Sequence, residues 1–277
     1  MLDKLIIFLL KNKLKGGGLL SKLFNRHDVA VENQYGVHMK LDPCEYVEKE
    51  IIVNGYYETE VLDLLMHAIE TSKTKSVFWD IGANVGLHAM TIKKLYPEVI
   101  SCTFEPYYYN FRKLAINLSC NYDIKIKKFS FGLSNDSEVN RMYTSEGNSG
   151  RTSFLEIEGA IDSTVNTLSC TGDFVVEQGL APRPTIIKMD VEGWELNVLK
   201  GCTDILDNPE LHTIIFEGPN KMAKTEVVPF LEAHGFNIAP IKRTSHIEET
   251  TENYIALRPV SVVKASHHIN KTAASNN

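Results

Sequence analysis

The 277-residue chain lacks several features that would place it in a specialised class of protein. Its five cysteines are odd in number, widely spaced and without a Cys-x-x-Cys pair. That pattern argues against a disulfide framework and a structural zinc site, and fits a reducing compartment. The N-terminal apolar run Leu5–Leu10 has six residues, whereas a membrane span needs about 20. A formal net charge of -6 gives no support to nucleic-acid binding as a main activity. With 43% hydrophobic and 23% charged residues, the chain is expected to be cytoplasmic and globular, with a sizeable core.

Residues 1–26 differ from the rest of the chain in charge. They carry six cations against the single acid Asp3, a local charge of +5 that leaves -11 for the remainder. A basic amphipathic leader of this kind suits contact with the inner face of an anionic membrane. Packing against its own domain or a second subunit of a homo-oligomer explains the pattern equally simply, and is the favoured interpretation.

Apolar, β-rich runs alternate with helical patterns through the body of the chain. Alternation of this kind is typical of βαβ units, in which a parallel sheet has helices on both faces. The linker 242–253 is too short for a comfortable parallel crossover, so the last strand is predicted to be antiparallel. The alternation breaks at about 132–184, a polar insertion expected to supply substrate loops and two short strands near 153–157 and 164–168. The predicted strands are 77–81, 100–104, 124–131, 185–189, 213–216, 235–241 and 254–257, and the predicted helices are 87–95, 110–118, 195–206 and 227–234.

The segment Asp80–Gly86 lies where a predicted strand ends and a helix begins. Its glycines let the backbone approach a ligand, and the helix start supplies free N–H groups. Glu105 follows Gly86 by 19 positions, at the end of the next strand. That spacing suits a carboxylate that accepts hydrogen bonds from two ribose hydroxyls. The sequence therefore predicts a nucleoside-containing ligand in the crevice beyond these strand ends.

Asp80 and the glycine spacing indicate which nucleoside is bound. The spacing differs from the dinucleotide pattern GxGxxG. A carboxylate at the helix start would repel a pyrophosphate and attract the cationic amino group of an amino acid, which favours S-adenosylmethionine. A nicotinamide-dependent sugar oxidoreductase stays open as an alternative, although no YxxxK dyad stands in a suitable place.

A second motif, residues 186–193, brings carboxylates to the carboxyl end of another predicted strand, where ligands bind in parallel sheets. Asp190 and Glu192 could orient a hydroxyl, accept its proton or hold a divalent cation, whereas acids at a helix start also stabilise a helix without catalysis. Asp190 is the first candidate for the general base, with Glu192 and Glu217 next. A Mg²⁺ or Ca²⁺ site is not favoured, because the chain has no oxygen-ligand cluster such as DxDxD.

Four separated motifs, at residues 78–86, 104–106, 188–193 and 199–201, together with a lead-in at 55–58, resemble the FkbM-type methyltransferases. The resemblance covers about residues 45–220 and implies an S-adenosylmethionine-dependent O-methyltransferase. It implies the class I Rossmann-like α/β fold, with a seven-stranded, mostly parallel sheet. Members often modify sugars or natural products, so the expected acceptor is a hydroxyl of a sugar in a glycan, glycolipid or natural product.

The resemblance also implies a set of cofactor contacts. The methionine end, the ribose and the adenine would be held in turn by the first strand's loop, by the end of the next strand and by residues after the third strand. The implied residues are Glu58, Asp80, Gly82, Ala83, Asn84, Gly86, Glu105, Pro106, Leu133, Ser134 and Asp190.

Two departures from the family pattern keep a third function open. The family's usual Leu-Asp pair before the long loop is Leu168-Ser169 here, and no His follows Glu217. A non-catalytic binding protein with the same fold is therefore a further alternative. The predicted organisation is a leader and lead-in over 1–44, a Rossmann-like methyltransferase domain over 45–260 and a polar tail over 261–277.

Overall fold

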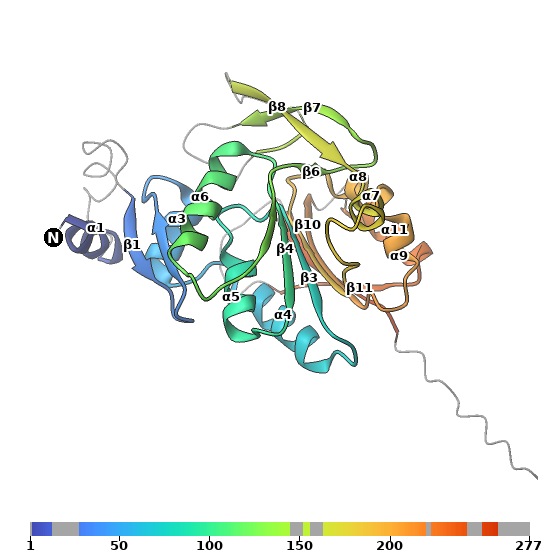
Figure 1. Ribbon diagram of the computed structural model, residues 1–277, viewed down its shortest axis with the longest axis horizontal. Coiled ribbons are helices and arrows are strands. Elements are labelled where there is room, and N and C mark those ends of the chain that lie inside the picture. Colours follow the sequence, from blue (N-terminus) through green and yellow to red (C-terminus); the bar gives the residue numbers. More distant parts are fainter. Residues whose placement is uncertain are drawn as a thin grey trace, which may run out of the picture.

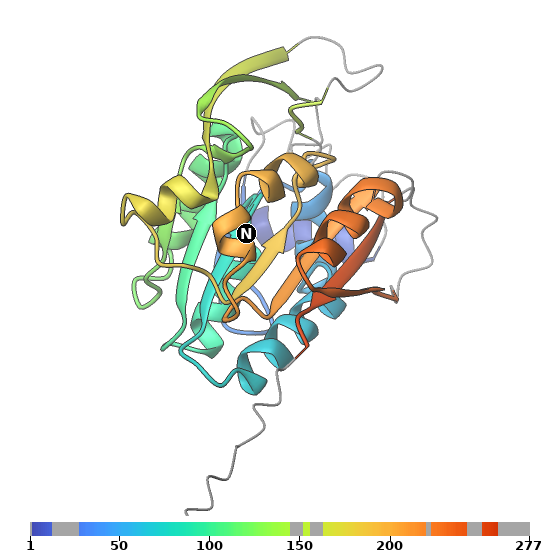
Figure 2. The same cartoon turned by 90° about the vertical axis from the view of Figure 1, so that its right-hand side faces the viewer.

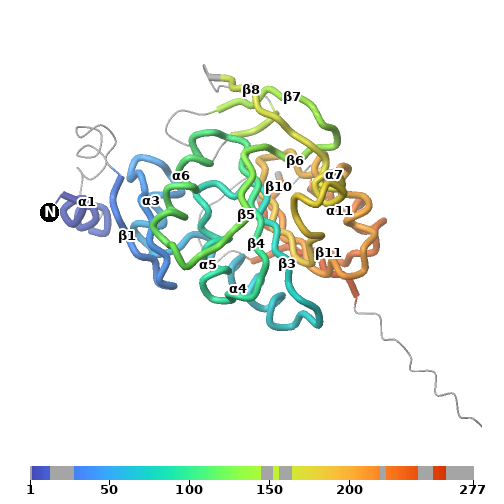
Figure 3. Tube along the Cα trace, in the orientation of Figure 1, coloured from blue at the N-terminus to red at the C-terminus, as the bar shows by residue number. Residues whose placement is uncertain are grey.

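The computed structural model describes residues 2–12, 28–144, 152–155, 163–219, 223–242 and 251–259. Its centre is a seven-stranded sheet in the order β5-β4-β3-β9-β10-β12-β11 (Figures 1 and 3). Strand β12 pairs antiparallel with both neighbours, and the other pairs are parallel. The predicted sheet, including its antiparallel last strand, is therefore confirmed. The strands are β3 Val77–Ile81, β4 Ile100–Phe104, β5 Lys127–Phe129, β9 Ile186–Met189, β10 Thr213–Pro219, β11 Asn237–Pro240 and β12 Thr251–Leu257.

Helices cover both faces of this sheet because its central strands are apolar on both sides. In β3, Trp79 points into one hydrophobic cluster and its neighbour Phe78 into the other, as the period of two requires. Helices α7 Gly172–Glu177, α8 Glu195–Lys200, α9 Thr203–Leu206 and α11 Val228–Ala233, the last preceded by the π-helical turn η1 Ala223–Val227, pack into the Trp79 cluster. Helices α4 Thr59–Thr71 and α5 Leu87–Leu95 pack into the Phe78 cluster.

The predicted helix 195–206 is divided into α8 and α9 by a close backbone contact. A Cβ atom on Gly201 would lie 1.9 Å from the carbonyl oxygen of Ser134. The chain after the third strand therefore passes directly over this position. Glycine is required here by the close approach of the backbone.

The N-terminal elements pack beside α6 Tyr108–Ser119. They are α1 Leu2–Lys11, the antiparallel hairpin β1 Val29–Glu32 and β2 His38–Leu41, and α3 Tyr46–Asn54. The side-chain oxygens of Asn117 on α6 and of Asn121 just after it accept the backbone N–H groups of Lys40 and His38, at 2.7 and 2.9 Å. The favoured prediction of a packed leader agrees with buried Ile6 on α1. Within the described part of the chain, no helix has both the length and the apolar character of a bilayer span.

The predicted insertion forms a second sheet, in the order β6-β8-β7, above the main sheet (Figures 1 and 2). Its strands are β6 Gly132–Leu133, β7 Glu138–Thr144 and β8 Ser163–Cys170. The predicted strand 164–168 lies within β8, whereas Ser153 makes only an isolated bridge with Tyr143. The tail 261–277 lies outside the described residues, and the predicted domain boundaries stay predictions.

Candidate active site

The two sequence motifs meet at the carboxyl ends of β3 and β9. Gly82 has a φ of +75°, and a Cβ atom on it would lie 1.8 Å from the carbonyl oxygen of Asp190. The Asp190 N–H in turn donates to the Ile81 carbonyl at 3.0 Å. Only glycine fits this crossing, because it combines a left-handed backbone with close contact to a neighbouring strand end.

A pocket of about 530 Å³ opens at this edge of the sheet. Its lining comes from the ends of β3, β4 and β9, from α6, and from the insertion, including β6. Seven predicted site residues line it: Gly82, Asn84, Glu105, Pro106, Leu133, Asp190 and Glu192. The sequence interpretation missed Asn110, Met142, Thr152 and Phe154, which also line it.

Glu105 is held in place by the backbone. Its two carboxylate oxygens accept the N–H groups of Asn84 and Tyr107, at 2.8 and 2.9 Å. Burial raises the pKa of Glu105 to about 7. Each oxygen keeps a further acceptor position. The residue therefore suits the predicted role of accepting two hydroxyl groups from a ligand.

Asn84 lines the pocket and carries a side-chain oxygen that is buried and, among the described residues, unsatisfied. Its φ of +50° is unusual for a residue other than glycine. Within the described part of the chain, its side-chain oxygen is buried and has no hydrogen-bond partner. A buried acceptor of this kind is normally satisfied, so a ligand that donates a hydrogen bond here fits the site.

Asp80 forms polar contacts within the protein, and its predicted contact with the cofactor stays a prediction. Asp80 is not one of the described residues that line the pocket. Its carboxylate accepts the Ala89 N–H at 3.1 Å and lies 3.9 Å from the ammonium of Lys188. Lys188 Nζ also lies 3.3 Å from Asp190 Oδ2. Burial favours the neutral amine, but the charges of Asp190 and Asp80 raise the pKa of Lys188. A buried cation therefore links these two carboxylates.

Four other predicted cofactor residues lie around the pocket without lining it. Ala83 is buried, and Gly86, the N-cap residue before α5, has a φ of +85°. Ser134 is fully buried and its hydroxyl accepts the Trp194 indole N–H at 3.1 Å. Glu58 accepts the side-chain N–H of Asn253 at 3.0 Å. These positions support the walls of the site, and direct cofactor contact by them stays a prediction.

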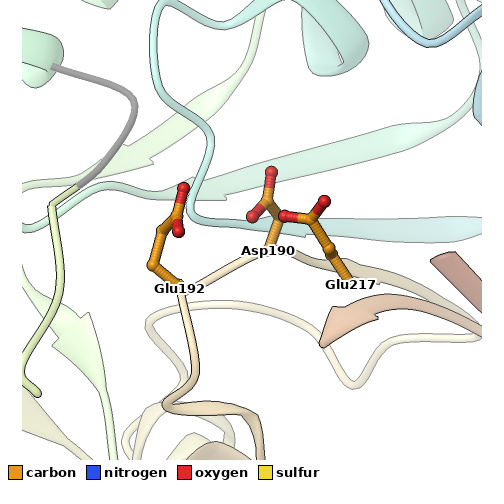
Figure 4. Close-up of side chains that lie close together, drawn as sticks. All are labelled: Asp190, Glu192 and Glu217. Atoms are coloured by element: carbon orange, nitrogen blue, oxygen red, sulfur yellow. The ribbon is translucent and has the colours of Figure 1, made fainter. Parts of the chain in front are cut away.

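Three half-buried carboxylates converge beside the pocket. Oxygens of Asp190, Glu192 and Glu217 all lie within 4.8 Å of one another (Figure 4). Asp190 and Glu217 are neighbours because each follows one member of the paired residues Met189 and Phe216 on β9 and β10. A group of this kind can accept a proton from a hydroxyl or hold a cation.

The loop that carries Glu192 is fixed from two sides. The buried Glu195 carboxylate accepts the N–H groups of Val191 and Gly193, at 3.3 and 3.2 Å. From the insertion, the Ser153 hydroxyl donates to the Glu192 carbonyl at 2.7 Å. These bonds hold Glu192 at a φ of +52°, so the carboxylate group is built on a constrained backbone.

A family model described as the methyltransferase FkbM domain matches residues 80–238. The chain belongs to the FkbM methyltransferase family. It is 35% identical over 195 residues to the hexuronic acid methyltransferase AglP of Haloferax volcanii, covering 70% of this chain and 74% of the relative. It is 23% identical over 220 residues to Methyltransferase 1 of Beauveria bassiana, with coverage of 70% and 82%.

A solved structure of similar fold is the methyltransferase FkbM from Methylobacillus flagellatus. The TM-score is 0.51 at 13% sequence identity, with 92% of this chain and 58% of that chain covered. The chain thus spans less than two thirds of that protein's length. These matches confirm the predicted family, the class I fold and the S-adenosylmethionine-dependent methyltransferase activity. The alternative of a nicotinamide-dependent oxidoreductase is therefore dropped.

Proposed function

We propose that this FkbM methyltransferase transfers a methyl group from S-adenosylmethionine to a hydroxyl of a sugar, in a glycan, glycolipid or natural product. The observation that carries the proposal is the convergence of Asp190, Glu192 and Glu217 beside the pocket. Several carboxylates at one point suit an acceptor with several hydroxyls, since each can take a hydrogen bond from a different one. The name of the related AglP, which refers to hexuronic acid, supports a sugar acceptor.

The residues that line the pocket fit the cofactor. When bound, S-adenosylmethionine supplies an electrophilic methyl group. Glu105 would accept the ribose hydroxyls, and the unpartnered oxygen of Asn84 would accept a further donor. Gly82 lets the Asp190 backbone pass close beside it, which brings the end of β9 to the pocket, and Pro106 and Leu133 add apolar lining.

Asp190 is the proposed general base. A sugar hydroxyl is a poor nucleophile at neutral pH, so a base within about 3 Å assists its attack. The Lys188 ammonium, 3.3 Å from Asp190, holds that carboxylate in one orientation. Glu192 and Glu217 would accept hydrogen bonds from neighbouring hydroxyls and so align the reacting oxygen.

The variant Asp190→Asn tests this assignment. We expect kcat to fall by about 10²- to 10⁴-fold, while calorimetry shows near-normal affinity for S-adenosylhomocysteine. Methyl transfer is measured with labelled cofactor on a panel of sugars, uronic acids and nucleotide sugars. Asp63→Asn, at an exposed position on α4, is the matched control. Unchanged turnover in Asp190→Asn would remove the assignment, and cofactor binding without transfer to any acceptor would favour the non-catalytic alternative.

The same carboxylates raise the question of a divalent cation, which the sequence did not favour. The chain has no local acidic cluster such as DxDxD, but Glu217 reaches the group from a separate strand. We infer proton transfer without a metal ion, because the Lys188 ammonium already supplies positive charge beside Asp190. Loss of activity in EDTA that Mg²⁺ or Ca²⁺ restores would show that a metal ion takes part.

A further inference from the structure

Helix α1 has two apolar sides, and only one of them is covered by the residues that the structure describes. Ile6 is completely buried and packs with the elements around β1 and α3. On another side, Leu5 and Phe8 are 47% and 57% exposed. Lys4 and Lys11 are exposed on the same turns. Because residues three and four apart share a helix face, Lys4, Phe8 and Lys11 form one stripe. Helix α1 itself lies at the outer edge of the molecule in Figure 1.

The charge of this helix face is of one sign. Asp3, the only acid among residues 1–26, is turned toward the protein, where its carboxylate accepts the Ala30 N–H at 3.2 Å. The charged residues exposed on the outer face are therefore all lysines. Four further cations, Lys13, Lys15, Lys22 and Arg26, follow in the sequence between α1 and β1. The leader carries +5, whereas the rest of the chain carries -11.

We propose that the exposed face of α1 docks this enzyme on an anionic lipid bilayer. Leu5 and Phe8 would enter the boundary between headgroups and acyl chains, and Lys4 and Lys11 would lie among the lipid phosphates. Amphipathic helices bind at this depth through the sum of apolar burial and attraction to anionic lipids. The acidic body is repelled by the same surface, so the opposite charges of the two parts fix which side faces the lipid.

A second copy of the chain fits this face less well. A symmetric dimer places the same patch of each subunit against itself. Two leaders of +5 would then meet, with Leu5 and Phe8 as the exposed large apolar side chains that α1 offers. Repulsion between like charges opposes that contact, whereas an anionic bilayer attracts the same positive charges.

Vesicle sedimentation with the full chain tests the proposal. Vesicles of phosphatidylcholine are compared with vesicles that also contain phosphatidylglycerol. We expect binding to the anionic vesicles only. Leu5→Ser/Phe8→Ser should weaken it by about tenfold or more. Lys4→Gln/Lys11→Gln should weaken it by roughly tenfold at low salt, with a smaller loss at high salt. Tyr122→Ser, at a position 87% exposed and away from α1, is the control.

Each outcome decides the proposal. Equal vesicle binding by the wild type and Leu5→Ser/Phe8→Ser, or no binding by the wild type, overturns it. A change from dimer to monomer in that variant, measured by sedimentation equilibrium without vesicles, assigns the face to a second copy and overturns it too. Affinity for S-adenosylhomocysteine should stay unchanged in these variants, which separates this proposal from the proposed function.

Discussion

Lys188 and Lys113 are both buried ammonium groups between two carboxylates, in different parts of the molecule. Lys188 lies between Asp80 and Asp190 at the edge of the pocket, and its side chain is 8% exposed. Lys113, on α6, contacts Asp28 before β1 and lies 3.4 Å from Glu48 on α3, and its side chain is 3% exposed. The two sites share their chemistry and their burial. They differ in that only Lys188 has a partner that lines the pocket.

The comparison shows that a buried charged cluster does not by itself identify an active site. Breaking a buried ion pair by removing one partner costs about 3–5 kcal/mol wherever it lies. Function is indicated only where one member can reach a ligand. Lys188 is therefore expected to act through Asp190, and Lys113 to hold the N-terminal elements on α6.

The largest effect is expected from removing each lysine in turn. Lys188→Met should lower kcat by at least about 10²-fold, because Asp190 loses the ammonium group 3.3 Å away that orients its carboxylate. Lys113→Met should leave kcat within about threefold, but lower the free energy of unfolding by about 3–5 kcal/mol. Steady-state kinetics from pH 5 to 9 and urea denaturation measure both. Normal kcat in Lys188→Met, or a large loss in Lys113→Met, would break the comparison.

The variant Gly82→Ala should displace Asp190 without changing its charge, and so tests whether its position matters. The added Cβ would lie 1.8 Å from the Asp190 carbonyl oxygen, on a backbone with a φ of +75°. We expect roughly a 10²-fold loss in kcat, because a displaced carboxylate no longer meets the acceptor and Lys188 together. Gly179→Ala is the control, since its φ is +66° and nothing lies within 4 Å of an added Cβ. It should lower stability by about 1 kcal/mol through backbone strain alone, and activity loss in both variants would point to strain as the cause.

Glu105 and Glu48 extend the comparison to two buried acids, because burial raises the pKa of each to about 7. Only Glu105 lines the pocket. As the pH falls from 8 to 6, protonation of Glu105 should weaken S-adenosylhomocysteine binding by up to about tenfold per pH unit below the pKa. Calorimetric titration across this range measures the effect. Glu105→Gln should bind more weakly and with a flat profile, while Glu48→Gln should keep the wild-type profile.

The sequence allowed residues at the pocket to be predicted, but not the ion pairs that lie behind it. The ends of β3, β4 and β9 meet because parallel strands place their carboxyl ends at one edge, so Gly82, Glu105 and Asp190 could be assigned from local motifs. The pairing of Asp80 with Lys188 depends on register, which places these two residues side by side on β3 and β9. No local pattern sets that register, so the pairing of Asp80 with Lys188 could not be predicted from the motifs.

Contacts between residues far apart in the chain left no recognisable pattern in the sequence. Glu48 and Lys113 are 65 positions apart, and Asp28 and Lys113 are 85 apart. Phe154 and Met142 reach the pocket because the insertion folds over the sheet. The insertion was expected to bind the acceptor, but its polar composition did not indicate which side chains would turn inward.

The smallest effect is expected from Glu48→Gln, in the pH dependence of stability. Burial raises the pKa of Glu48 from 4.5 to about 7, although Lys113 opposes the shift. Between these values the folded state holds a proton that the unfolded state has released, so the contribution of Glu48 is fully present below pH 4.5 and is lost as the pH rises through 7. The whole change amounts to at most about 3 kcal/mol. Urea denaturation from pH 4.5 to 8 should show a smaller decline in Glu48→Gln than in the wild type. An unchanged decline would mean that Lys113 keeps Glu48 ionised throughout, and the two lysines would then differ in location alone.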